Sequence, residues 1–182
     1  INPHKWLFVP LDLSILYVKE PRVLKQAFSY SAEYLKTKEE HEIPNYMDYG
    51  LNLGRKFRAL KLWFNIKYLG VEGIRAKIRE HIRLAKLFYD NLRQNENFEI
   101  MAPLTLSTVC FRAKPKCQSN ANDYNQQLLD RLNSSGKCFL SHTKLSEQFV
   151  IRFVVSSYWT EEKHIRNFID LLYQYKQELD NL

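Results

Sequence analysis

The sequence predicts a mixed fold of helices and strands, whose second half is a small α+β domain with an antiparallel sheet. Two long stretches, at about 53–69 and 74–93, repeat apolar residues at the helical period. After Asn95 this period gives way to short β-rich runs that are separated or followed by helical segments. Consecutive strands and helices of this kind are typical of an α+β domain. We therefore expect a division into residues 1–95 and residues 96–182.

The first 50 residues are less regular. Residues 13–18 form a short, β-rich run that ends before Pro21, so we expect a strand there. Residues 22–49 show little periodicity and much polarity, which predicts a long loop with a helical turn. Long loops inside compact folds often serve as lids.

The remaining elements follow from periodicity. The first long helix carries Phe57, Leu60 and Phe64 on one stripe, and Gly70 and Gly73 bracket a break before the second helix. Beyond residue 95 the expected strands lie at 98–101, 107–112, 138–140 and 149–155, and the expected helices at about 121–133 and 161–179.

Composition narrows the class of protein. The chain has 182 residues, 45% of them hydrophobic, and a formal net charge of +7. The basic residues concentrate in 54–63 and 75–83, where they alternate with core positions of amphipathic helices, so we expect solvated helix faces and no nucleic acid. No apolar run is long enough for a membrane span. Three cysteines without zinc spacing predict reduced thiols in a cytoplasmic protein, and no metal site.

The stretch Ile1-Asn-Pro-His-Lys-Trp6 holds the most reactive combination of residues. Lys5 lies between an imidazole and an indole, next to an apolar run. A lysine that is desolvated by such neighbours has a lowered pKa, and its neutral amine attacks a carbonyl to form an imine. The alternative is a surface lysine at the edge of a strand.

Two motifs together carry a family resemblance. Asn2-Pro-His-Lys-Trp6 resembles the lysine segment of group II pyridoxal-phosphate-dependent decarboxylases, with the aromatic-L-amino-acid decarboxylases as the closest subgroup. Leu53-Gly-Arg-Lys-Phe-Arg-Ala-Leu-Lys-Leu-Trp63 resembles a helix of the same family, and 68–73 and 78–81 continue the match. The resemblance covers essentially the whole chain. It implies an α/β fold, the C-terminal portion of a fold-type I enzyme: the end of the large pyridoxal-phosphate domain (1–95) plus the small C-terminal domain (96–182).

The resemblance also implies roles for individual residues. Lys5 takes the position of the Schiff-base lysine for pyridoxal 5'-phosphate. His4 and Asn2 match positions near the cofactor phosphate, although a packed imidazole and an Asn-Pro turn remain alternatives. Arg55 matches a position that binds the substrate carboxylate, or is one more basic helix residue. Gly54 matches a position beside the substrate ring, where a missing side chain leaves room.

Tyr34 resembles the tyrosine of the family's mobile loop. In relatives this loop reaches the active site of the neighbouring subunit, which implies a homodimer, and the phenol is suited to protonate the substrate Cα. The charged run 37–42 and a shorter spacing to Gly54 depart from the family pattern.

These roles predict decarboxylation of an L-amino acid, of the DOPA, tryptophan or tyrosine type, to its amine and CO2. The alternatives are another activity of the same cofactor class (glutamate or histidine decarboxylation, or aldehyde synthesis) and a non-catalytic interaction domain. The family's aspartate for the pyridine nitrogen and its ring-stacking histidine find no match and would precede Ile1. We therefore expect this chain to be a C-terminal fragment that is inactive alone.

Overall fold

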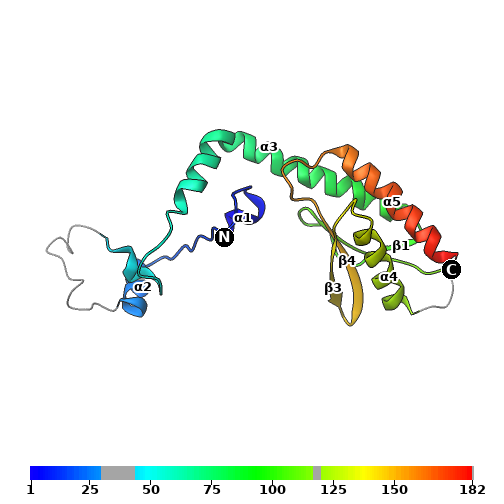
Figure 1. Cartoon of the computed structure of the whole chain (residues 1–182), viewed down its shortest axis with the longest axis horizontal. Coiled ribbons are helices and arrows are strands. Elements are labelled where there is room, and N and C mark those ends of the chain that lie inside the picture. Colours follow the sequence, from blue (N-terminus) through cyan, green and yellow to red (C-terminus); the bar gives the residue numbers. More distant parts are fainter. Residues whose placement is uncertain (30–43, 117–119, 182) are drawn as a thin grey trace. The chain divides into compact units, whose positions relative to one another are not determined.

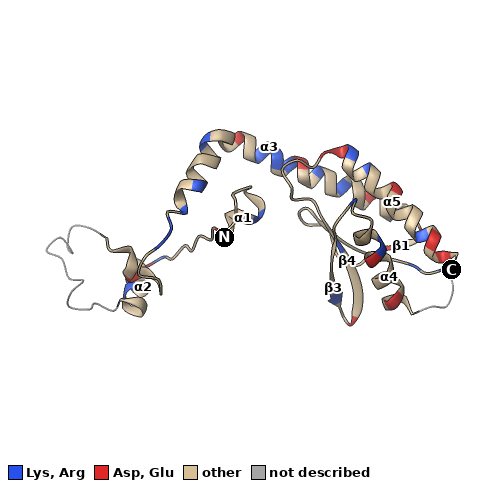
Figure 2. Ribbon diagram, viewed as in Figure 1, with Lys and Arg blue, Asp and Glu red and all other residues tan. Residues whose placement is uncertain are grey.

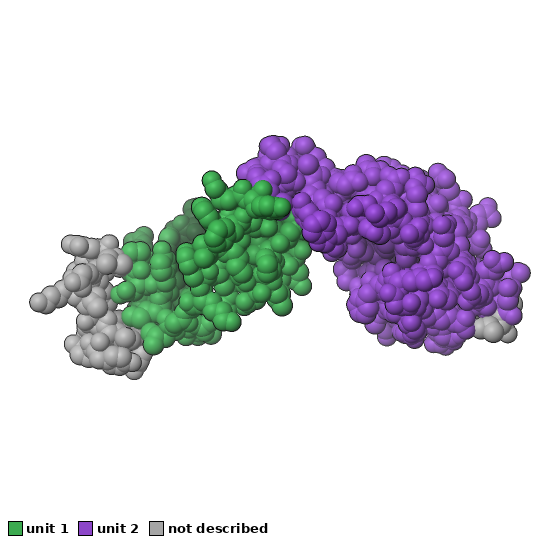
Figure 3. Space-filling model, turned by 45° about the horizontal axis from the view of Figure 1, so that its top comes forward, with its two compact units in different colours: residues 1–68 green, residues 69–182 purple. Residues whose placement is uncertain are grey.

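The computed structural model describes residues 1–29, 44–116 and 120–181. Packing divides the chain into two compact units, residues 1–68 and residues 69–182 (Figure 3). The helix α3, Ala59–Arg93, runs through the division and departs from helical geometry at Gly70, where φ is 68°. Glycine adopts this left-handed conformation without the steric cost that a Cβ would impose. The predicted break at Gly70 is thus confirmed, while the predicted domain boundary near residue 95 stays a prediction.

The unit of residues 69–182 is built on a four-stranded sheet (Figure 1). The strands are β1 (Phe98–Ile100), β2 (Thr108–Ala113), β3 (Ser141–Leu145) and β4 (Gln148–Val154). Their order is β1-β2-β4-β3, and every neighbouring pair is antiparallel. The predicted small α+β domain with an antiparallel sheet is therefore confirmed.

Three helical segments bury apolar side chains with this sheet: the second half of α3, α4 (Ala121–Ser134) and α5 (Glu162–Asp180). Phe88 from α3 lies at the centre and is fully buried. Its ring contacts Phe111 of β2, Phe153 of β4 and Phe168 of α5, at centroid distances of 5.4, 4.1 and 5.4 Å. The alternation of apolar residues along β2 and β4 points these rings to one face, so the sequence pattern and the core agree.

One predicted strand in this unit is misplaced. Residues 138–140 are not a strand; the ladder begins at Ser141. The reason is the side chain of Asn133, near the end of α4, which accepts from the Leu140 N–H (2.8 Å) and donates to the Leu140 carbonyl (3.1 Å). These bonds use the backbone groups that a strand would offer to its neighbour.

The unit of residues 1–68 contains α1 (Pro3–Trp6), α2 (Pro21–Phe28), the 3-10 helix η2 (Tyr46–Tyr49) and the first turns of α3. The predicted helical turn within 22–49 is found, because α2 and η2 lie in that region. The predicted strand at 13–18 is wrong. Its only strand-like pairing in the described residues is with Ile1, since Ile1 and Ile15 exchange backbone hydrogen bonds of 2.9 and 2.8 Å. Without a longer partner, β propensity alone does not produce a strand.

The helix predicted to start near Leu53 starts instead at Ala59. Figure 2 shows that Lys and Arg residues are spread along both halves of α3. None of the described helices combines the length and the apolarity that crossing a membrane requires.

Candidate functional site

Residues 1–15 fold back on themselves, and we call them the lysine loop. Pro3 occupies the first position of α1, where its fixed φ suits a helix start and no N–H is needed. The ends of the loop are joined by the Ile1–Ile15 backbone bonds and by a 2.6 Å hydrogen bond from the Ser14 hydroxyl to Asn2 Oδ1. Lys5 therefore lies in a short helical turn whose two flanking segments are tied together.

Lys5 is exposed, and no described residue forms an ion pair or hydrogen bond with its ammonium group. The amine is thus accessible to a carbonyl compound. The desolvated environment considered from the sequence is not formed by the described residues of this chain. The assignment of Lys5 as a nucleophile therefore depends on its place in the motif and on the exposure of its amine.

His4 is held by the backbone of Leu13. Its Nδ1 lies 2.6 Å from the Leu13 carbonyl oxygen and 3.1 Å from the Leu13 nitrogen, so the tautomer decides which contact is the hydrogen bond. Because Nδ1 faces the backbone, Nε2 is the nitrogen left to bind an outside group. Asn2 uses its Oδ1 for Ser14, which leaves its amide NH2 as a donor. The Asn2 amide is therefore a donor that suits a phosphate, and His4 Nε2 is a second one in the tautomer whose Nδ1 accepts from the Leu13 N–H.

The first half of α3, together with Arg58 immediately before it, binds the segment that follows Lys5. Asn65 Nδ2 donates to the Leu7 carbonyl (2.6 Å), and Lys61 Nζ donates to the carbonyls of Pro10 (3.0 Å) and Asp12 (2.9 Å). The guanidinium of Arg58 donates through both Nε and Nη2 to the Asp12 carboxylate, at 3.1 and 2.9 Å. This pairing lowers the pKa of Asp12 from 3.8 to about 2. We call Arg58, Lys61 and Asn65 the α3 clasp.

Sequence reasoning missed the α3 clasp. A signal was present, since positions 58, 61 and 65 have the spacing of one helix face and two of them belong to the second motif. Their acceptors are mostly backbone carbonyls, which leave no trace in the sequence.

The predicted substrate residues precede α3. Arg55 is exposed, and its guanidinium packs so closely on Gly50 that a Cβ there would lie 2.1 Å from Nη2. A Cβ built on Gly54 meets nothing within 4 Å, so this position is open. No hydrogen bond or ion pair between described residues links Arg55 to Lys5, His4 or Asn2. Tyr34, and with it the charged run 37–42, falls outside the described residues.

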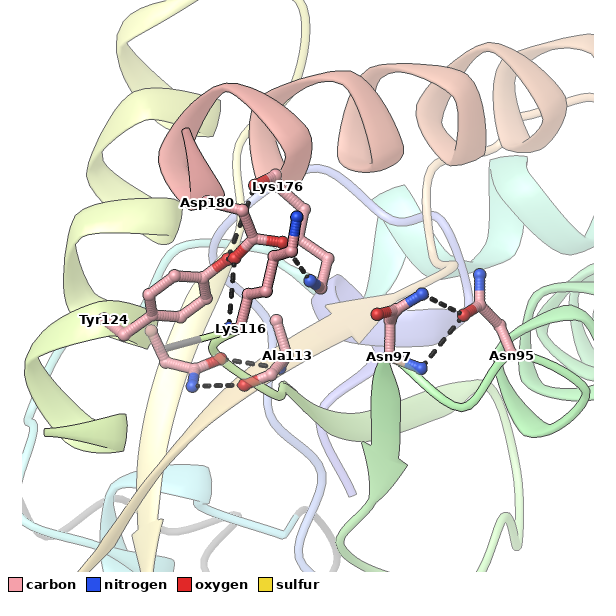
Figure 4. Close-up of polar contacts among 8 residues, drawn as sticks. Asn95, Asn97, Ala113, Lys116, Tyr124, Lys176 and Asp180 are labelled. Carbon is pink, nitrogen blue, oxygen red and sulfur yellow. Dashed lines mark hydrogen bonds and ion pairs between the residues drawn. The ribbon is translucent and has the colours of Figure 1, made fainter. Parts of the chain in front are cut away.

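A second polar cluster lies at the end of α5 (Figure 4). Asp180 accepts from the buried Lys176 ammonium (2.5 Å) and the Tyr124 hydroxyl (2.6 Å). Burial by itself would raise the pKa of Asp180, but the bonds from Lys176 and Tyr124 outweigh it and lower that pKa below 3.8. On α4, the Asn125 side chain exchanges two hydrogen bonds with the backbone of Ala113. These contacts join α4, α5 and β2, which is a structural role.

The histidines of the second unit have comparable roles. His81 is buried, and burial lowers its pKa. His142 stacks on Phe149, and His164 caps the start of α5. Within the described residues, no group of three or more potential ligands could hold a metal ion.

Comparison with known proteins identifies the family. Residues 1–114 match the family model described as "Pyridoxal-dependent decarboxylase conserved domain". The chain belongs to this family. The match includes both motifs, so the lysine loop and the α3 clasp lie in the part of a pyridoxal-dependent decarboxylase that the family shares.

Among individual relatives, the chain is similar to enzymes named for aromatic amino acids and their products. The chain is 43% identical over 170 residues to tyrosine decarboxylase 2 of Narcissus pseudonarcissus, with 91% of this chain and 34% of the relative covered. It is 42% identical over 170 residues to phenylacetaldehyde synthase of Arabidopsis thaliana, with 91% of this chain and 35% of the relative covered. Its structure matches Oryza sativa TDC with PLP and tryptamine at a TM-score of 0.91 and 34% identity, over 98% of this chain and 38% of the other. The chain thus spans about a third of the length of the relatives it matches.

Proposed function

We propose that this chain serves the decarboxylation of an aromatic L-amino acid to its amine and CO2, with Lys5 as the residue that binds pyridoxal 5'-phosphate through a Schiff base. The observation that carries the proposal is the lysine of the first motif: its amine is exposed, has no partner among the described residues, and lies on a loop whose two ends are hydrogen-bonded to each other. The relatives named tyrosine decarboxylase and TDC support an aromatic substrate.

The residues of the lysine loop fit such a cofactor. The Lys5 amine reacts with a carbonyl, while the Asn2 amide and His4 Nε2 supply hydrogen bonds to a phosphate. Pyridoxal phosphate supplies, when bound, the electron sink for the cleavage of the bond between Cα and the carboxylate. We assign the substrate carboxylate to Arg55, whose planar guanidinium holds a carboxylate by two hydrogen bonds. The open position at Gly54 leaves room for an aromatic ring.

The proton that completes the amine comes, in this proposal, from the phenol of Tyr34. A positioned acid next to Cα delivers a proton faster than the solvent does. The family resemblance assigns this tyrosine to a loop that serves a neighbouring subunit, so we propose that the complete gene product is a homodimer. Sedimentation of the active protein tests the assembly, and an active monomer at assay concentration would contradict it.

Aldehyde synthesis is the second candidate, because the identity to phenylacetaldehyde synthase (42%) is nearly the same as that to tyrosine decarboxylase (43%). Overall similarity does not separate the two activities. The tyrosine at position 34 favours the decarboxylase, since a proton donor at Cα leads to the amine.

The experiment is a product analysis of the complete gene product with tyrosine, tryptophan, DOPA and phenylalanine. Equal amounts of amine and CO2 support the proposal. Aldehyde, ammonia and peroxide in place of the amine would support the second candidate. Borohydride reduction followed by mass spectrometry identifies the lysine that carries the cofactor, and a label on any lysine other than Lys5 would overturn the site.

A further inference from the structure

The α3 clasp has a geometry that an ordinary basic helix face does not need. Lysine prefers to keep its compact, strongly hydrated ammonium in water. The Lys61 ammonium instead lies within hydrogen-bonding distance of two carbonyls, those of Pro10 and Asp12. Holding a long side chain in one conformation costs conformational entropy, so this contact needs a compensating interaction. Two charge-assisted bonds to the same segment provide it.

The bound segment has few backbone partners of its own. In residues 7–12, Leu7 and Val9 donate to the Pro3 carbonyl, at 3.2 and 3.4 Å, and the second bond is long. The carbonyls of Leu7, Pro10 and Asp12 are bound by side chains of α3. The conformation of this segment is therefore set by the α3 clasp more than by local backbone bonding.

The α3 clasp acts on one side of Lys5, and the closure of the lysine loop acts on the other. Asn2 and His4, which precede Lys5, are bound to Ser14 and Leu13. Leu7, two residues after Lys5, is bound by Asn65. The backbone that carries the amine is consequently fixed from both directions, while the amine itself stays exposed.

We propose that Arg58 and Lys61 are positioning residues, which hold the lysine loop through the Asp12 carboxylate and the Pro10 and Asp12 carbonyls so that the Lys5 amine is presented in one orientation. The inference rests on the proposed function, because it gives a purpose to the fixed orientation of Lys5. It explains why the second motif contains basic residues besides Arg55: Arg58 and Lys61 act on the backbone of the first motif.

The low pKa of Asp12 supports this arrangement. Its carboxylate is held ionised by the guanidinium of Arg58 down to a pH of about 2, so the contact persists throughout the range in which enzymes of this type are assayed. Asp12 is exposed and Arg58 is half-buried, with side-chain exposures of 59% and 32%. Exposed ion pairs contribute little to global stability. Loss of the pair is therefore expected to change the position of the segment without unfolding the protein.

The test uses Arg58→Met and Lys61→Met in the complete gene product, because methionine keeps an apolar stem of similar length and removes the donors. Lys67→Met is the matched control: Lys67 lies on the same helix and, in the described structure, interacts only with the ring of Trp63. The first measurement is hydrogen exchange of the Val9 amide, which donates to the Pro3 carbonyl, and of the Leu13 amide, whose nitrogen lies 3.1 Å from His4 Nδ1. The second is the rate at which added pyridoxal phosphate becomes attached to Lys5, followed by borohydride trapping.

We expect each clasp variant to speed exchange of these amides roughly tenfold, the effect of losing about one net hydrogen bond. We expect slower attachment of the cofactor and an unchanged thermal midpoint, and we expect Lys67→Met to match the wild type in all three. Exchange and attachment at wild-type rates in both variants would overturn the inference. Equal acceleration in Lys67→Met would also overturn it. A wild-type protein that carries the cofactor on another lysine would refute the proposed function, while the exchange result would still decide whether the α3 clasp holds the loop.

Discussion

In residues 69–182, four strands and three helical segments enclose one apolar core, whereas residues 1–68 bury only Pro3, Val9 and Leu13 among the apolar side chains of their described positions. The first unit exposes large apolar side chains instead, among them Phe57, Trp63, Phe64 and Tyr68. Several long-range hydrogen bonds of its described residues end on backbone carbonyls.

The two units therefore show two ways in which a sequence fixes a structure. In the second unit the free energy of unfolding depends on the volume of buried side chains, so any well-packed substitution of similar size is tolerated. In the first unit single hydrogen bonds determine where a reactive group points, and each of them adds little to stability. Substitutions in the first unit are expected to change chemistry, and substitutions in the second to change stability.

The largest effect expected from this contrast is that of Lys5→Ala. The side chain is exposed, so its removal changes the free energy of unfolding by no more than about 0.5 kcal/mol. Turnover by the complete gene product is expected to fall by on the order of 10⁴-fold or more, as when a covalent nucleophile is lost. Steady-state kinetics and thermal unfolding of the same preparation measure both effects. Residual activity within tenfold of the wild type would remove Lys5 from the site.

Phe88→Ala tests how strongly the stability of the second unit depends on its buried core. Phe88 is fully buried among Phe111, Phe153 and Phe168, and its truncation is expected to cost about 3–5 kcal/mol of the free energy of unfolding. Phe64→Ala, at a position 58% exposed in the first unit, is expected to cost less than about 1 kcal/mol. Urea denaturation of the 182-residue chain compares the two. Equal losses would mean that the first unit has a core comparable to that of the second.

The same contrast explains what the sequence could predict. The short β-rich runs after Asn95 predicted three of the four strands, because a half-buried sheet favours such residues. The helical stripe of Phe57, Leu60 and Phe64 predicted a helix, but these side chains are exposed and are not part of the core. The strand expected at 13–18 failed because a strand needs a partner, and β propensity carries no information about one. The strand expected at 138–140 does not form, because the Asn133 side chain occupies the backbone hydrogen-bonding groups of Leu140. The sequence gives no sign of this contact.

The candidate site, like the fold, was predictable from the sequence only in part. The first motif (Asn2–Trp6) and the second motif (Leu53–Trp63) could be recognised from the sequence, and the family that they predicted is the family to which the chain belongs. The roles of Asn2, His4, Gly54 and Arg55 stay predictions. The contacts of Arg58 and Lys61 with the lysine loop were out of reach, since a backbone carbonyl accepts a hydrogen bond whatever its side chain.

Tyr34→Phe is expected to give the next largest effect, and it tests chemistry in the first unit without removing packing volume. Loss of a general acid slows its step by about a hundredfold. We expect the complete gene product to keep its cofactor and to release CO2, while in air the product shifts from the amine towards the aldehyde and ammonia, with dissolved O2 as the oxidant that is reduced to peroxide. Chromatography of both products measures the ratio, and amine formation at the normal rate would show that the phenol is not the donor.

Mixed subunits extend this test to the proposed homodimer. If the loop of one subunit serves the site of the other, a dimer of Tyr34→Phe and Lys5→Ala subunits has one site with both defects and one site with neither. Amine synthesis should then rise, on mixing and reassembly, above that of either variant preparation alone. Hybrids that form without any recovery would place Tyr34 in the site of its own subunit.

The smallest effect concerns acid stability, and it arises in the second unit at Asp180. Although burial opposes ionisation of this carboxylate, Lys176 and Tyr124 hold its pKa below the ordinary value of 3.8. A carboxyl group with a lowered folded-state pKa contributes stability that is complete above its unfolded-state pKa and is lost as the pH falls through the folded-state value. We therefore expect the unfolding free energy to be insensitive to this group above about pH 5 and to decline with acidification below pH 4.

The variant Asp180→Asn removes the titrating group. It should be less stable than the wild type at neutral pH, because Lys176 loses its charged partner. Its free energy of unfolding should also depend less steeply on pH between 4 and 2. Asp170→Asn provides the control: this carboxylate lies exposed on the same helix and has no hydrogen-bond or ion-pair partner among the described residues. Urea denaturation of the 182-residue chain at several pH values yields the three slopes, and a slope in Asp180→Asn equal to that of the wild type would show that the Lys176–Asp180–Tyr124 cluster does not control acid stability.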